Sequence, residues 1–350
     1  MILTYKIKHH RDYSDELKRA KNVAQYVLEH HPYSAKFSSK DVKQFGLKSV
    51  MSNQIIRKYG RNRKLKRINK VKLTIPNQGI QYDPATQIIK ITSLKLELRH
   101  EIPIYFDTIN QIEVDNKYLY VSVTHNENSE YEATEWLGVD RNTTGHVAVV
   151  ASPDTGKIMK LGKSGQHIHE KYKHIRKILQ KRGKYRKVKQ LKNRESRIVR
   201  DINHKISKKI VDNAYENGYG IKLEELKGIR KNKKQANSFR YSLNSWSFYQ
   251  LQMMIEYKAK LLGVPIAYID PAYTSQSCSR CSHIGNRNGK SFQCPSCGHV
   301  EHADVNAAFN IALSPNIVRF ATESDDAKGN TGIPKAAMIR KQSTVEPHAL

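Results

Sequence analysis

The spacing of hydrophobic positions changes along the chain, and each change predicts a different kind of structure. Near the start the period is helical, because apolar residues recur at intervals of three and four through Asp15–His30, with Ser14 as a candidate N-cap. Over residues 70–125 apolar and polar positions alternate, which predicts short strands of a small antiparallel barrel or sandwich. We therefore expect residues 1–135 to form mainly helical segments, up to about residue 60, attached to a β-barrel.

From Trp136 onward the pattern is typical of an α/β domain. A strand ending at Asp140 is followed by two more strands and then by helices, and such a meander is how an RNase H-like domain begins. Further strands are predicted at residues 146–151, 157–161, 221–224 and 264–269, and helices within residues 171–209, interrupted at Gly183, and at 245–262 and 303–313. Residues 316–350 are polar and weakly patterned, so we expect a partly disordered tail.

The charge of the chain indicates its class of partner. Lysines and arginines number 61 against 32 acidic residues, a formal net charge of +29. Such an excess favours nucleic acid, whose phosphates exchange condensed counterions for protein cations. A solvated charged face is the alternative for the second of two basic stretches. The candidate nucleic-acid contacts are Arg57, Lys58, Arg61, Arg63, Lys64 and Arg67 in the first stretch, and Arg182, Lys184, Arg186, Lys187, Arg194 and Arg197 in the second.

Neither a membrane nor a secreted setting is expected from the sequence. It contains no apolar run of about 18 residues, as a spanning helix requires, and no secretory apolar segment follows Met1. All four cysteines are concentrated in one segment that has the spacing of a metal site, so disulfides are not needed. A reducing, intracellular compartment follows, with no membrane partner.

The cysteines form two Cys-x-x-Cys pairs, Cys278 with Cys281 and Cys294 with Cys297. Two such pairs can fold as knuckles and present four thiolates tetrahedrally to one Zn²⁺ ion. We expect the zinc to be structural, because four thiolates leave no open coordination position for a catalytic water.

Three carboxylates lie at the ends of predicted elements: Asp140 and Glu224 each end a strand, and Asp304 lies in the first turn of the last helix. Hard oxygen ligands of this kind suit Mg²⁺ or Mn²⁺, and two such ions about 3.5–4 Å apart can activate water for phosphodiester hydrolysis. Taken singly, each carboxylate is also explained as a solvated strand end or a helix-start residue. Glu225 is an alternative to Glu224.

These motifs together resemble those of a known family. Leu137-Gly138-Val139-Asp140, Leu223-Glu224-Glu225-Leu226 and the cysteine segment followed by Asp304-Val305-Asn306-Ala307-Ala308 look like the three RuvC motifs and the zinc ribbon of TnpB proteins. These proteins are encoded by IS200/IS605-type transposons and are similar to the type V CRISPR effectors. The lead-in Tyr273–Cys278 also fits, and the resemblance covers about residues 136–313.

The resemblance implies an RNA-guided DNA endonuclease with a single RuvC-like site, which binds a guide RNA and target DNA in the cytoplasm of a prokaryote, associated with the nucleoid. It implies catalytic, Mg²⁺-binding roles for Asp140, Glu224 and Asp304, and zinc-ligand roles for the four cysteines. A non-cleaving nucleic-acid-binding accessory or repressor protein of a transposon is the alternative.

The resemblance also implies a division of the chain. Residues 1–135 correspond to helices plus a β-barrel wedge domain, residues 136–270 and 300–315 to the nuclease domain, 271–299 to the zinc ribbon and 316–350 to a tail. In one respect the chain departs from the family: a glycine is common two residues after the first aspartate, where this chain has Asn142. Gly145 is expected to supply the turn instead.

Overall fold

The computed structural model describes residues 1–30, 33–61, 65, 67–99, 102, 106–142, 145–226, 248–321 and 338–340. The chain divides into two compact units, of which the first comprises residues 1–126 with the C-terminal segment from 330, and the second residues 127–329. The division therefore falls ahead of residue 136, where the strand pattern changes. Among the described residues, no helix is long and apolar enough to cross a membrane.

The main sheet of unit 1 has the strand order β17-β1-β7-β6-β2. Its strands are β1 (Ile2–Lys8), β2 (Leu73–Pro76), β6 (Thr108–Val114), β7 (Tyr118–Thr124) and β17 (Met338–Arg340). Strand β1 corrects the helical interpretation of the first residues. Leu3, Tyr5 and Ile7 alternate with more exposed positions and are buried, which is the period of a strand. β1 pairs antiparallel with β7 and parallel with β17.

Unit 1 also holds a small sheet and two helices. The sheet consists of β3 (Gln81–Asp83), β4 (Ile88–Ile91) and β5 (Leu96–Arg99), and the helices are α1 (Ser14–Glu29) and α2 (Ser49–Gly60). Short 3₁₀ turns span Tyr33–Lys36, Lys43–Phe45, Asn77–Gly79 and Thr92–Leu94. Helix α1 is confirmed, but Ser14 is not its N-cap: Tyr13 precedes it without a side-chain cap, and Asp12 Oδ1 accepts bonds from the amide and hydroxyl of Ser14.

The sheet of unit 2 has the order β10-β9-β8-β11-β12-β16. Its strands are β8 (Glu135–Arg141), β9 (Ala148–Ala151), β10 (Ile158–Leu161), β11 (Tyr219–Glu224), β12 (Ile266–Ile269) and β16 (Ile317–Phe320). β8, β11 and β12 are parallel, and β9, β10 and β16 run antiparallel to their neighbours. The expected mixed α/β architecture is confirmed.

Strand β16 corrects the expectation that the tail begins at residue 316. Residues 317–320 pair with β12 at the edge of the sheet, although Ile317, Val318 and Phe320 remain partly exposed. β17 likewise lies within the expected tail. The remainder of that expectation, residues 322–337 and 341–350, lies outside the described residues.

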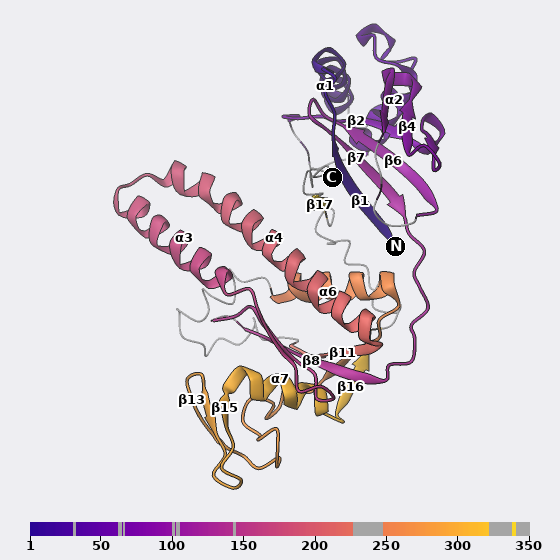
Figure 1. Cartoon of the computed structure of the whole chain (residues 1–350). Coiled ribbons are helices and arrows are strands. Elements are labelled where there is room, and N and C mark those ends of the chain that lie inside the picture. Colours follow the sequence, from indigo (N-terminus) through magenta and orange to yellow (C-terminus); the bar gives the residue numbers. More distant parts are fainter. Residues whose placement is uncertain are drawn as a thin grey trace, which may run out of the picture. The chain divides into compact units, whose positions relative to one another are not determined.

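Helices cover both faces of the unit 2 sheet (Figure 1). The helices are α3 (Ser164–Lys181), α4 (Tyr185–Asn217), α6 (Phe248–Leu262) and α7 (Ala303–Leu313). On one face, Ile210 of α4 and Ile255 of α6 pack against Leu137 and Leu223 of the central strands. On the other face Val305 of α7 packs against β9. Because side chains alternate along a strand, the residues of β8 and β11 that do not face α4 and α6 face α7.

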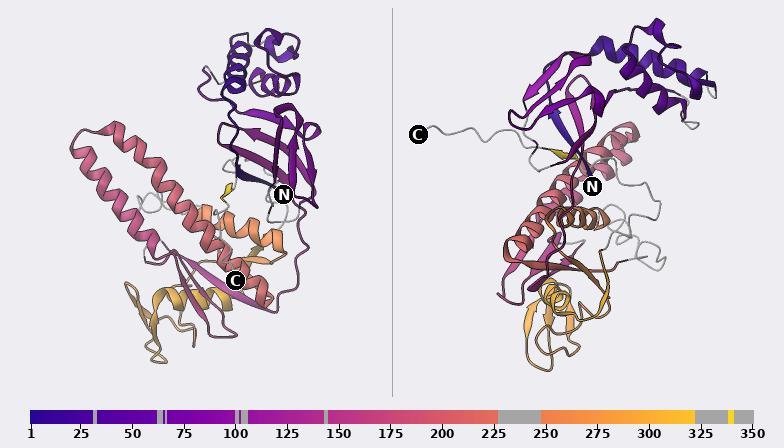
Figure 2. Two further views of the ribbon diagram at one scale, coloured as in Figure 1. Left: turned by 45° about the horizontal axis from the view of Figure 1, so that its top comes forward. Right: turned by 90° about the vertical axis from the view of Figure 1, so that its right-hand side faces the viewer.

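Helices α3 and α4 form a long hairpin, which is visible in all three views (Figures 1 and 2). Gly183 lies between them with φ of +65°, so the predicted interruption is confirmed. Glu195 of α4 is buried and contacts His169 and Arg176 of α3, so that one carboxylate ties the two helices together. The apolar face of α4 near its C-terminal end then reaches the sheet.

Candidate active site and metal centre

Asp140 lies near the C-terminal end of β8, on the face of the sheet that α7 covers. Leu137 and Val139 point to the opposite, α4 and α6 face, so Gly138 and Asp140 point toward α7. Asp140 is 9% exposed, and the side-chain amide of Asn142 donates to its Oδ2 at 2.9 Å. Asn142 thus holds Asp140 where the family commonly has a glycine, and Gly145 supplies a turn with φ of +77°.

Glu224 ends β11, the parallel neighbour of β8. Leu223 is paired with Val139, so Glu224 and Asp140 follow at the same edge of the sheet. Ile221 and Leu223 face α4 and α6, which leaves Glu224 on the α7 face with Asp140. Register therefore puts Glu224 on the same face as Asp140, whereas Glu225 forms an ion pair with Arg319 of β16.

Asp304 lies in the first turn of α7, and two features of the sheet fix that helix. A Cβ on Gly138 would lie 2.0 Å from the carbonyl oxygen of Ala308, so only glycine lets α7 approach β8 this closely. At the other end, the buried Lys222 ammonium donates to the carbonyl oxygens of Ala312 and Ser314, at 2.8 Å each. A cation at this position also complements the negative end of the helix dipole.

Glu224 and Asp304 lie close enough to Asp140 to influence its ionisation. Burial, together with repulsion from Glu224 and Asp304, raises the pKa of Asp140 to about 7, while the hydrogen bond from Asn142 opposes the shift. Burial also raises the pKa of Glu224, against the hydrogen bond from Thr274 and the nearby guanidiniums. Like charges gathered in a desolvated site disfavour the ionised form, and a cation reverses that.

Several residues around the carboxylates were not predicted from the sequence. Thr274 donates to Glu224 Oε1 at 2.6 Å, and Arg141 donates to the Glu224 carbonyl oxygen at 2.6 Å. Lys290 lies 2.6 Å from Asp304 Oδ2, and Arg287 lies 3.5 Å from Oδ1. The only sign of Arg141 in the sequence is its position next to Asp140. Arg287 and Lys290 follow no periodic pattern that would have predicted their contacts.

The three carboxylates are suitable ligands for divalent cations. All donors are hard oxygens, the set suited to Mg²⁺ or Mn²⁺. Asp304 is 1% exposed, and its Oδ1 accepts no hydrogen bond in the described part of the chain, although the Arg287 guanidinium lies 3.5 Å away. The three carboxylates do not form one tight cluster with ligand atoms within 4.8 Å of each other.

The four predicted cysteines do converge. The Sγ atoms of Cys278, Cys281, Cys294 and Cys297 all lie within 4.8 Å of one another, and two of the Sγ–Sγ distances are 3.7 and 3.5 Å. Tetrahedral zinc with bonds of about 2.3 Å places its sulfurs about 3.8 Å apart, so the spacing fits that ion. Amide groups of Cys297 and Ser296 lower the pKa of the Cys294 thiol to about 6, which favours the thiolate that binds metal.

The cysteine segment is physically joined to the carboxylate site through α7. Its strands β13 (Asn286–Asn288), β14 (Ser291–Gln293) and β15 (Val300–His302) form a separate three-stranded sheet that leads directly into the helix. Asn306 of α7 donates to the Ser277 carbonyl oxygen at 2.7 Å and accepts from the Ser279 amide at 2.9 Å. The cysteine segment and the helix that carries Asp304 are therefore held together directly.

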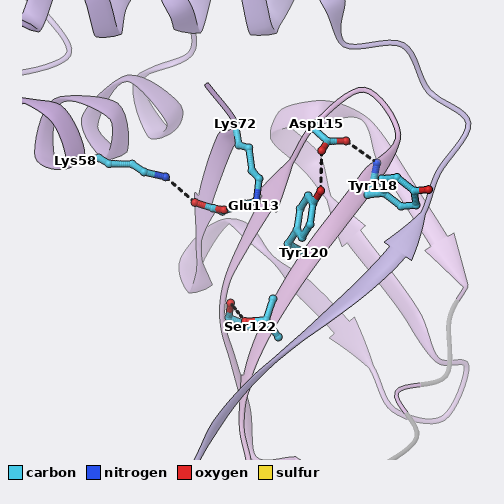
Figure 3. Close-up of polar contacts among 8 residues, drawn as sticks. Lys58, Lys72, Glu113, Asp115, Tyr118, Tyr120 and Ser122 are labelled. Atoms are coloured by element: carbon cyan, nitrogen blue, oxygen red, sulfur yellow. Dashed lines mark hydrogen bonds and ion pairs between the residues drawn. The ribbon is translucent and has the colours of Figure 1, made fainter. Parts of the chain in front are cut away.

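The basic residues predicted to contact nucleic acid are distributed over both units. Arg57 and Lys58 lie near the end of α2, and Figure 3 shows the Lys58 ammonium directed at Glu113, 2.7 Å from its Oε1. Lys72 contacts the other oxygen of that carboxylate at 2.8 Å. Arg61 and Arg67 are exposed, whereas Arg63 and Lys64 lie outside the described residues.

In unit 2, the predicted cations gather on the α3–α4 hairpin. Arg182 and Lys184 lie in its turn, and the others follow along the first half of α4: Arg186, Lys187, Arg194 and Arg197. All six side chains are exposed. A nucleic-acid role for these residues stays a prediction.

Known proteins resemble this chain most clearly over the segment that holds the cysteines and Asp304. The model of the Cas12f1-like TNB domain matches residues 248–311, which hold the cysteines and Asp304. A CRISPR-associated endodeoxyribonuclease Cas12f1 of Sulfoacidibacillus thermotolerans is 42% identical over 141 residues, and the TnpB-like protein MJ0751 of Methanocaldococcus jannaschii is 39% identical over 155. The resemblance to TnpB proteins is confirmed.

Those two matches cover 39% and 42% of this chain, and only 32% and 55% of the relatives' own lengths. In fold, the chain resembles Cas12f1 in a cryo-EM structure of the Cas12f1–sgRNA–target DNA complex, with a TM-score of 0.55 and 15% identity. That likeness covers 87% of this chain and 82% of the other. It extends the similarity in fold beyond the segment matched in sequence.

Proposed function

We propose that this protein is an RNA-guided DNA endonuclease of the TnpB family, which hydrolyses DNA phosphodiester bonds at a single RuvC-like site. The observation that carries the proposal is the meeting of Asp140, Glu224 and Asp304, from three separate segments, on one face of the unit 2 sheet. Raised pKa values at Asp140 and Glu224 mark a site whose carboxylates are stabilised in their ionised form by cations.

Each carboxylate has a defined part in the proposed site. Asp140 and Glu224 would hold one divalent ion, and Asp304 would complete the set for a second. Two Mg²⁺ or Mn²⁺ ions bound there would supply an activated water and stabilise the leaving oxygen. The chain's own residues orient the ligands: Asn142 holds Asp140, and Thr274 and Arg141 hold Glu224.

The division of the chain follows from the same proposal. The helices and small sheets of residues 1–135 are the recognition region with a barrel-type wedge, residues 136–270 and 300–315 are the RuvC-like nuclease domain, and residues 271–299 are a zinc ribbon. In this scheme the four cysteines hold a structural Zn²⁺ and supply no catalytic ligand.

The partners are a guide RNA and a DNA target, and base pairing with the guide reads most of the target sequence. The exposed cations of the α3–α4 hairpin, together with the net charge of +29, support binding to a polyanion. The proposed partners also agree with the named activities of the relatives, among them the putative RNA-guided DNA endonuclease InsQ of Escherichia coli.

The test is to co-express the chain with its native flanking DNA, purify it and sequence the nuclease-protected RNA. A discrete RNA that ends in flanking sequence would supply a matching DNA target. Mg²⁺-dependent cleavage of that target by the wild type, and none by Asp140→Asn, is the expected result. Metal-dependent cutting retained in Asp140→Asn would overturn the assignment of the site.

A non-cleaving transposon accessory or repressor is the second candidate, since the basic hairpin alone suffices for binding. It predicts salt-sensitive binding without any nick in plasmid DNA at any Mg²⁺ or Mn²⁺ concentration. A nick assay on supercoiled plasmid, with wild type and Asp140→Asn compared, separates the two.

A further inference from the structure

The two cations that contact Asp304 both come from one hairpin of the cysteine segment. Arg287 lies on β13, and Lys290 lies in the turn between β13 and β14. Neither residue belongs to α7, the helix that carries Asp304. Lys290 makes the shorter contact, 2.6 Å from Nζ to Oδ2. The hairpin thus places an ammonium on a carboxylate that we assign to metal binding.

The ammonium of Lys290 lies on the side of Asp304 that faces the other ligands. An ideal Cβ on Gly145 would lie 3.7 Å from Lys290 Cε and 3.9 Å from its Nζ, and Gly145 belongs to the loop that follows β8 and Asp140. The charge therefore sits between the elements that carry Asp304 and Asp140. A divalent ion shared by these elements would compete for the same space and the same Oδ2 atom.

The backbone of Lys290 is held independently of its side chain. Its carbonyl oxygen accepts a hydrogen bond from the amide of Ala303, the first residue of α7, at 2.9 Å. The side chain is 37% exposed, so the four-carbon stem has a route to solvent. Lys290 can therefore leave Asp304 while the hairpin stays docked against the helix.

We propose that Lys290 is the counterion of Asp304 in the metal-free protein, and that a divalent ion binding at Asp304 has to displace it. Lys290 makes its direct ion pair with Asp304 and acts on Asp140 only at longer range, so the first ion binds between Asp140 and Glu224. The second ion binds more weakly because it competes with an ammonium held in place by the chain. Lys290 thereby determines how much more weakly the second ion binds than the first. This inference rests on the proposed two-ion site.

The test is a Mn²⁺ titration of the zinc-loaded full-length protein, followed by the electron paramagnetic resonance of free Mn²⁺. The wild type should show one tighter and one weaker ion. Lys290→Gln should tighten the weaker ion by roughly fivefold or more, since it removes a competitor held by a partly exposed ion pair. Lys290→Arg keeps the charge and should stay close to the wild type.

Arg280→Gln is the matched control, because it removes an exposed cation of the same segment away from Asp304. Its weaker ion should bind as in the wild type. A second readout is the shift in melting temperature with added Mn²⁺, which should be larger for Lys290→Gln than for either Arg280→Gln or the wild type. It also reports whether Lys290→Gln is folded.

The outcomes separate this inference from the proposed function. Unchanged or weaker Mn²⁺ binding in a folded Lys290→Gln, with a wild type that binds two ions and cuts DNA, overturns the role of Lys290 alone. Equal tightening in Arg280→Gln would also overturn it, since the effect would then be one of general charge. A wild type that binds no Mn²⁺ overturns both.

Discussion

The hydroxyl of Thr274 lies 2.6 Å from Oε1 of Glu224, fifty residues earlier in the chain, and donates a hydrogen bond to it. Thr274 belongs to the segment that leads into the cysteines, and Asn310 of α7 holds its carbonyl oxygen at 2.8 Å. One hydrogen bond therefore joins the end of β11 to the element that the cysteine cluster organises. The geometry of Glu224 depends on the folding of a segment that is remote in sequence.

Replacing Thr274 tests this connection. Thr274→Val keeps the shape but removes the donor, so a buried carboxylate loses a charge-assisted hydrogen bond worth about 1.5–3 kcal/mol. Because that bond lowers the pKa of Glu224, the pKa should rise further. We expect Mn²⁺ affinity at pH 7 to fall roughly tenfold, as measured by calorimetry, with partial recovery at higher pH. Thr274→Ser retains the donor and should stay near the wild type.

Without Mg²⁺ or Mn²⁺, the stability of the protein should depend on pH through the ionisation of Asp140. Its pKa is raised to about 7 in the folded protein, against about 4 when unfolded. The folded state therefore binds the proton more tightly, and this contribution, present in full below about pH 4, is lost as pH rises to about 7. Asp140→Asn, which cannot ionise, should lose less stability than the wild type between pH 5 and pH 8.

Thermal melts of the wild type and Asp140→Asn at pH 5 and pH 8 check this. The informative quantity is the difference between the two proteins in how much stability each loses. His204, whose pKa burial lowers to about 4, acts with the opposite sign but is common to both. Glu224 leaves a residual slope of the same sign as Asp140. Parallel melting curves for the wild type and Asp140→Asn across this range would show that Asp140 ionises normally.

The close approach of α7 to β8 should make Gly138 intolerant of any side chain. In Gly138→Ala the new methyl would lie 2.0 Å from the Ala308 carbonyl oxygen and 2.4 Å from the Ala312 nitrogen, so the helix has to move. We expect a loss of about 3 kcal/mol or more in the free energy of unfolding, measured by urea denaturation. Metal binding should weaken too, because Asp304 moves with the helix.

Gly156→Ala is the control for backbone effects alone. Gly156 has φ of +65°, and nothing lies within 4 Å of an added Cβ. Its cost should be the strain of a left-handed alanine, about 1–2 kcal/mol. A similar loss at Gly138 and Gly156 would mean that α7 relaxes easily.

Loss of the cysteine site should disturb the carboxylate site. Cys294→Ser should release zinc, measured as bound zinc per chain, and should loosen the segment that holds Thr274 and Asp304. DNA cleavage should therefore fall along with zinc content. Ser296→Ala, an exposed neighbour in the same knuckle, should keep both. Normal cleavage by a zinc-free Cys294→Ser would mean that the cysteine site does not position Asp304.

Sequence pattern and structure agree best where the chain is locally determined. Helix α7 has the predicted bounds, Ala303–Leu313, and the hairpin turn falls at Gly183 as expected. Strand β1 was missed although Leu3, Tyr5 and Ile7 alternate, because the stronger helical period of α1 dominated that region. β16 gave no such signal, since an edge strand with three partly exposed apolar residues has no clear alternation.

The sequence by itself determined the chemistry of this protein: four cysteines at metal-binding spacing, carboxylates at the ends of elements, and an excess of positive charge. These follow from residue types and from local periods of two and 3.6. Tertiary structure alone separated Glu224 from Glu225, because strand register puts them on opposite faces of the sheet. It alone paired Lys290 with Asp304 and fitted α7 against Gly138, since such contacts depend on segments that are distant in sequence and meet only when packed.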